Sequence, residues 1–90
     1  MANVPNFDGM NPGELMAFWK RYTRPTRKDA EALVGDRRKG FTTYAARIAN
    51  YACNKAVAIG RRAKGDVAAA EVYEHSMDLC YEGLPPDLRW

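Results

Sequence analysis

This sequence contains few of the residues on which catalysis, metal binding or disulfide stabilisation depends. It has one histidine and two cysteines, and its seven glycines are scattered without a phosphate-binding pattern. Cys53 and Cys80 are too few for a disulfide framework and lack the spacing of metal ligands, although a single bridge between them remains open. We therefore expect a protein that is not an enzyme and that uses no metal or other cofactor.

Long apolar runs are also missing. No stretch approaches the roughly 18 consecutive apolar residues that cross a membrane as a helix. Residues 1–7 have no basic region followed by an apolar stretch, so they do not read as a secretory signal. We therefore expect a cytoplasmic protein without a membrane partner.

Segments that alternate apolar and polar residues, as strands do, are absent, and β-branched aliphatic residues are few. The sequence predicts an all-α fold of three to four helices. Residues 11–90 would form one helical domain, after a polar lead over residues 1–10 and with a short tail over residues 83–90. Much of the apolar fraction of 47% is alanine, so the core is light, and docking on a partner or on a second copy would add stability.

Capping residues predict two short helices in the first half. Asn11 is a helix N-cap, with proline next to it and Glu14 three residues later, and Pro25 stops this helix near Tyr22 or Thr23. Residues 26–34 form a second short helix that Gly35 ends.

The second half predicts an antiparallel helical hairpin, with one helix over about 38–64 and the other over about 67–82. Gly65 ends the first helix and Asp66 caps the second. A stripe that includes Ile48 and Ile59 marks the buried face of the longer helix. The inward face of the final helix is expected to comprise Ala69, Val72, Tyr73, Ser76, Met77, Leu79 and Cys80.

Charge is strongly segregated along the chain. Thirteen of the fourteen Lys and Arg residues, and only three acids, lie in residues 20–64, whereas residues 65–90 hold six acids and one base. Bases with few acids nearby create an outward field, and interleaved tyrosines can stack on a ligand. The candidate partner- or nucleic-acid-binding residues are Arg24, Arg27, Arg37, Arg38, Tyr44, Tyr51, Lys55 and Arg62. The alternative is that the acidic final helix neutralises part of this charge and water solvates the rest.

The acidic stripe Glu71, Glu74, Asp78 and Glu82 has the spacing of the wet face of a helix, and no second helix offers the acids that a metal site needs. His75 lies at the edge of this stripe, as a solvated histidine would.

These observations favour a non-enzymatic interaction protein that docks on a protein partner or assembly as an adaptor, regulator, inhibitor or structural subunit. The alternative is a nucleic-acid-binding protein that uses the basic segment 20–64. A homo-oligomer is compatible with either function.

Overall fold

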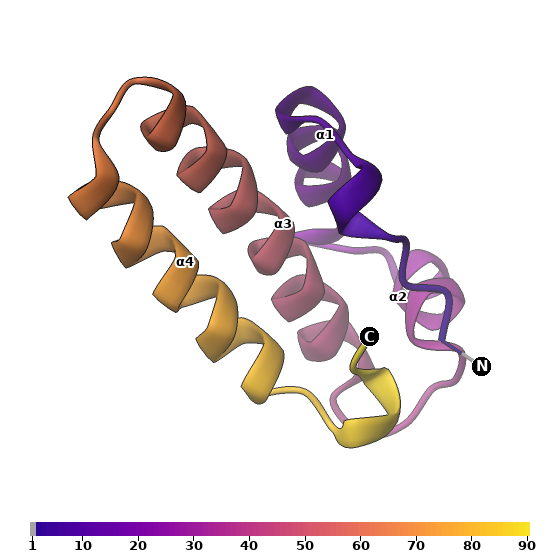
Figure 1. Cartoon of the computed structure of the whole chain (residues 1–90). Helices are drawn as coiled ribbons and strands as arrows, with labels where there is room; N and C mark the ends of the chain where they lie inside the picture. Colours follow the sequence, from indigo (N-terminus) through magenta and orange to yellow (C-terminus); the bar gives the residue numbers. More distant parts are fainter. Residues whose placement is uncertain (1) are drawn as a thin grey trace.

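The longest helix, α3 (Phe41–Ala63), lies at the centre of the fold. The computed structural model describes residues 2–90, and 72% of these residues are helical. Helix α1 (Pro12–Tyr22) and helix α4 (Val67–Glu82) pack on opposite sides of α3, and α2 (Arg27–Val34) lies against its first half (Figure 1). Two single 3-10 turns, η1 (Phe7–Gly9) and η2 (Pro86–Leu88), lie in the N-terminal lead and in the tail. The all-α fold and the α3–α4 hairpin predicted from the sequence are confirmed.

The helices begin and end where local capping chemistry places them. The side chain of Asn11 accepts a hydrogen bond from the Glu14 backbone N–H at 2.9 Å, and the Glu14 carboxylate accepts one from the Asn11 N–H at 3.1 Å. The side chains of Thr26 and Asp66 cap α2 and α4 by accepting a hydrogen bond from the backbone N–H three residues later, that of Asp29 and Ala69 respectively. Gly35 ends α2 with φ of 94°, a conformation that favours glycine because it has no Cβ.

Small residues on α3 allow its neighbours to approach closely. Ala45, Ala49, Ala52 and Ala56 are buried along one side of the helix. Ile48 lies within the same buried face and is fully inaccessible to solvent, as predicted. Because alanine contributes little area, most of the larger core side chains other than Phe41 and Ile48 come from the elements around α3: Phe7, Leu15, Leu33, Leu84 and Leu88.

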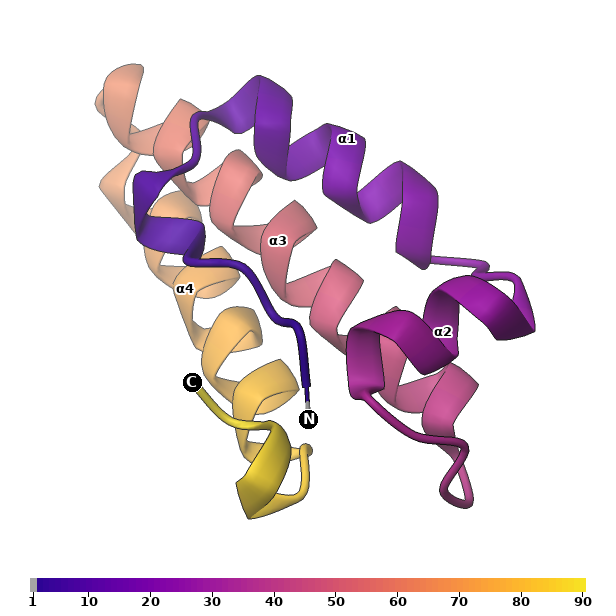
Figure 2. The same ribbon diagram turned by 90° about the vertical axis from the view of Figure 1, so that its right-hand side faces the viewer.

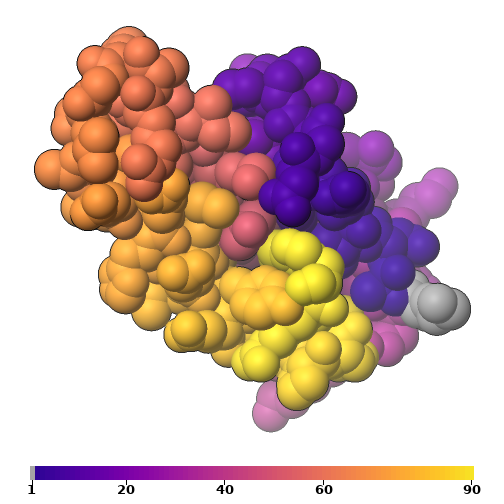
Figure 3. All heavy atoms as spheres, viewed as in Figure 1, coloured from indigo at the N-terminus to yellow at the C-terminus, as the bar shows by residue number. Residues whose placement is uncertain are grey.

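The lead and the tail lie side by side across the face of α3 that α1 and α4 leave open (Figures 2 and 3). Phe7 in the lead is 1% exposed, and its ring contacts the ring of Trp90 in the tail at a centroid distance of 5.2 Å. Asn3 ties the lead to the end of α2, because its backbone N–H donates to the Leu33 carbonyl at 2.9 Å. The lead is polar in sequence, yet it contributes an aromatic side chain to the core, and the tail folds back on the bundle.

The prediction that Ile59 is a core residue is wrong. Its side chain is 38% exposed. Helix α1 has 11 residues and α3 has 23, so at about 1.5 Å per residue α1 covers only half of the length of α3. Lys55 still contacts Asp8 of the lead, and Ile59 lies one turn beyond that contact.

The inward face predicted for α4 is also partly wrong. Val72 is 63% exposed and Leu79 is 53% exposed, whereas Ala70 is the buried residue of this helix. Tyr73, Met77 and Cys80 are half-buried, as expected for the side that faces α3. Among the long helices, α4 packs against α3 only. The apolar residues on the other side of α4, Val72 and Leu79, therefore remain in solvent.

Candidate interaction surfaces

Most of the bases predicted to face a partner are ion-paired within the chain. Arg37 donates from Nε to the Glu31 carboxylate at 2.6 Å. Lys55 contacts Asp8 at 3.1 Å, and Arg62 forms a two-point pair with Glu74 at 2.9 and 2.5 Å. The acids come from the lead, from α2 and from α4, which fold against the basic segment.

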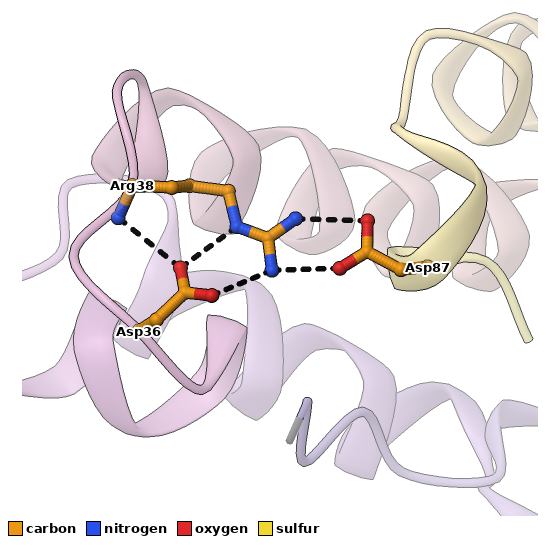
Figure 4. Close-up of polar contacts among 3 residues, drawn as sticks. All are labelled: Asp36, Arg38 and Asp87. Atoms are coloured by element: carbon orange, nitrogen blue, oxygen red, sulfur yellow. Dashed lines mark hydrogen bonds and ion pairs between the residues drawn. The ribbon is translucent and has the colours of Figure 1, made fainter.

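Arg38 is the most fully engaged of these bases (Figure 4). Its Nε and Nη2 donate to the two carboxylate oxygens of Asp36 at 2.7 Å each, and its Nη1 and Nη2 donate to Asp87 at 2.8 and 2.7 Å. These hydrogen bonds lower the pKa of Asp36 to about 2 and also lower the pKa of Asp87. Two carboxylates around one guanidinium leave the cluster with a net negative charge. The premise that Arg37, Arg38, Lys55 and Arg62 have few acids to pair with is therefore wrong.

The two candidate tyrosines pack against the core. The ring of Tyr51 lies 4.7 Å from the ring of Trp90 and 5.4 Å from the ring of Phe7, and burial raises the pKa of its hydroxyl. Tyr44 is half-buried beside Gly40. Because Tyr51 projects from α3 and packs against the lead and the tail, it stabilises the fold and offers little free face for stacking on a ligand.

Arg24 and Arg27 lie together at the junction of α1 and α2. With the exposed residues Lys20 and Lys28 they form what we call the basic corner. The structure places no acid within ion-pair distance of these four bases in residues 2–90, whereas neighbouring Arg21 pairs with Asp29. The Arg27 guanidinium lies 5.4 Å from the centroid of the Phe41 ring, a cation–π contact that partly engages it. Of the eight predicted binding residues, only Arg24 and Arg27 therefore carry a charge that has no ion pair in residues 2–90.

A second surface lies on the side of α4 that points away from α3. Ala68, Val72, His75 and Leu79 are exposed there, and we call this stripe the α4 outer face. Exposed acids border it: Glu71, Asp78 and Glu82. Sequence reasoning missed this surface because it assigned Val72 and Leu79 to the core. The available signal was the presence of two apolar stripes on one helix, of which a single neighbouring helix can bury only one.

Neither cysteine is suited to nucleophilic chemistry. Cys53 and Cys80 are free thiols, and burial raises the pKa of each, so both remain protonated at neutral pH. His75 is exposed. Across residues 2–90, no three His, Cys, Asp or Glu side chains are grouped so as to hold a metal ion. Within the same range, no helix is both long enough and apolar enough to cross a membrane.

Comparison with known proteins returns no match for this chain among protein-family models, curated proteins or solved structures.

Proposed function

We propose that this chain is a non-enzymatic interaction protein that docks on a protein partner. The observation that supports this function best is the exposure of Val72 and Leu79 on α4. Folded monomers hide most of their large aliphatic side chains, and an apolar stripe rimmed by charge is typical of a protein–protein interface. No catalytic role forms part of the proposal.

Internal pairing of four of the six candidate bases argues in the same direction. A nucleic-acid surface gains its affinity from bases that are free to neutralise phosphates and release counterions. Arg37, Lys55 and Arg62 would each have to leave an acid of this chain to contact a phosphate, and Arg38 would have to leave two. The cost of breaking these pairs reduces the gain from each phosphate contact.

Nucleic-acid binding is the second candidate, and the basic corner is the observation that favours it. Lys20, Arg24, Arg27 and Lys28 are exposed at the end of α1, in the loop after it and at the start of α2, where they could follow a phosphate backbone.

Chemical crosslinking of the tagged chain in its own cells separates these functions. We expect an adduct that survives nuclease treatment, and binding that is reconstituted when the crosslinked protein is purified and mixed with this chain. An adduct that nuclease removes would contradict the proposal. So would binding of random DNA or RNA that weakens about 10³-fold or more between low and moderate salt, because that slope requires several phosphate contacts.

A further inference from the structure

The α4 outer face has the spacing of a coiled-coil seam. Its four exposed residues, Ala68, Val72, His75 and Leu79, follow one another at intervals of four, three and four positions. This is the a/d interval at which the apolar residues of one helix pack against another helix. The stripe therefore fits a helical partner better than an extended one.

The charges beside the seam determine what that helix must carry. Glu71 and Asp78 each precede a seam residue, Val72 and Leu79 respectively, so they occupy the flanking position that forms ion pairs across a helix pair. Residues 67–82 contain no lysine or arginine. Glu74, the other acid in the middle of α4, already pairs with Arg62 of α3 and so lies on the inner side.

A second copy of this chain is a poor occupant of the same face. Two α4 helices packed against each other would bring only acids to the edges of the seam, because α4 carries no base. Like charges across a helix pair cost stability, whereas opposite charges select the partner. The exposed bases that have no ion pair in residues 2–90 lie off α4, among them those of the basic corner, Lys39, and Arg61 and Lys64 at the end of α3.

We propose that the α4 outer face binds an amphipathic helix of a protein partner, one with apolar residues at heptad spacing and Lys or Arg beside them. The apolar residues pack on Val72 and Leu79, and the flanking bases pair with Glu71 and Asp78. This inference rests on the proposed docking function and names the surface and the chemistry of the partner. The seam is about 17 Å long at 1.5 Å per residue, so the interface is small and the binding is of the weak, transient class.

A synthetic three-heptad peptide provides the test. It carries Leu at the a and d positions and Lys at e and g, and it is used at concentrations where it is monomeric. One control peptide replaces each Lys by Glu, and a second scrambles the sequence so that the heptad phase is lost. We expect the Lys peptide to bind at least about tenfold more tightly than either control, measured by fluorescence anisotropy, a difference that corresponds to about 1.4 kcal/mol.

Variants of this chain locate the binding. The double variant Val72→Ser with Leu79→Ser is expected to weaken binding of the Lys peptide by about tenfold or more, since the exposed methyl groups supply most of the contact area. The matched control is Ile59→Ser with Val67→Ser, which also removes two exposed aliphatic side chains but lies outside the seam. This control should bind within about twofold of the parent chain. The variant Glu71→Lys with Asp78→Lys should reverse the preference toward the Glu peptide. Circular dichroism checks that each variant keeps its helix content.

The outcomes separate this inference from the function on which it rests. Equal binding of the Lys and Glu peptides, or binding that the Ser double variant leaves unchanged, overturns the inference. A dimer in sedimentation that the Ser double variant abolishes also overturns it, because the occupant would then be a second copy. In each of these cases, a crosslinked protein that survives nuclease treatment and binds this chain again after purification would still support the docking function. Docking would then use a surface other than the α4 outer face. Loss of that crosslink would remove the function itself.

Discussion

Arg38 and Asp87 are separated by 49 positions in the sequence, and their side chains form a two-point ion pair with N–O distances of 2.8 and 2.7 Å. Arg38 lies in the loop between α2 and α3, and Asp87 lies in the tail (Figure 4). The pair therefore fastens the tail to the loop that precedes α3, near the middle of the basic segment. Beneath it, Leu84 and Leu88 of the tail are buried in the core.

Replacement of Arg38 by alanine should loosen the tail. Asp36 and Asp87 would lose their shared partner and would then repel each other. We expect a melting temperature lowered by several degrees, together with a changed environment of Trp90, which fluorine NMR of fluorotryptophan-labelled protein reports. Arg37→Ala is the matched control, since it removes a single exposed pair with Glu31 and should change neither signal appreciably. An Arg38→Ala melt that coincides with that of the parent would show that the tail is held by its apolar contacts alone.

Acid should release the same contact. Hydrogen bonds from Arg38 lower the pKa of Asp36 from 3.8 to about 2 and lower the pKa of Asp87. A carboxylate whose pKa is lowered by folding adds stability that is complete above its unfolded value and is lost as the pH falls through the folded value. The Trp90 fluorine signal should therefore move as the pH falls from about 4 to about 2. In Asp87→Asn most of that movement should be missing, and a full transition in this variant would assign the effect to another group.

Two isoleucines on α3 should respond differently to the same change. Ile48 is fully buried, so Ile48→Asp places an unpaired carboxylate in the core at a cost of several kcal/mol, which is comparable to the whole stability of a small domain. We expect a melting temperature lowered by more than about 10 °C, or no folded state. Ile59→Asp should lower it by only a few degrees, because Ile59 is 38% exposed. Equal losses for both variants would contradict the burial described for α3.

Gly83 and Arg47 should be energetically coupled. A Cβ built on Gly83 would lie 2.8 Å from Cζ and 3.2 Å from Cδ of Arg47, so Gly83→Ala must displace the guanidinium from the C-terminal end of α4. The displacement forfeits the favourable interaction of a cation with a helix C-terminus. The backbone of Gly83 has φ of −76°, which alanine adopts without strain.

A double-mutant cycle measures this coupling. Gly83→Ala should cost about 1 kcal/mol more free energy of unfolding in the parent than in an Arg47→Ala background, where alanine is neutral or stabilising. Identical effects of Gly83→Ala in the two backgrounds would show that the side chain of Arg47 moves aside freely.

Local chemistry explains why the helix boundaries could be predicted from the sequence. The caps at Asn11, Thr26 and Asp66 act on backbone groups within three residues, and the stop at Gly35 acts within the same turn. These features need no knowledge of the tertiary structure. The burial of Ile48 was also predicted correctly, because this residue lies on the apolar stripe of a long amphipathic helix and away from the helix ends.

The outward faces could not be predicted in this manner. Whether Val72 and Leu79 are buried depends on how many helices contact α4, and helical periodicity does not contain that number. The charge pattern was misleading for a related reason. Acids that are distant in sequence, such as Asp8 and Asp87, are brought by the fold to Lys55 and Arg38. Charges that are segregated along the chain therefore pair in space at five of the thirteen bases of residues 20–64.

We propose that this protein recognises a protein partner through α4 and does not recognise nucleic acid through its bases. NMR titration of the isotope-labelled chain tests this proposal most directly, with the Lys heptad peptide in one sample and a random-sequence duplex in another, both at physiological salt. We predict that the peptide shifts the amide signals of Val72 and Leu79 and that the duplex leaves the spectrum unchanged. Shifts at Arg24 and Arg27 with the duplex, together with unmoved α4 signals in the presence of the peptide, would contradict the account.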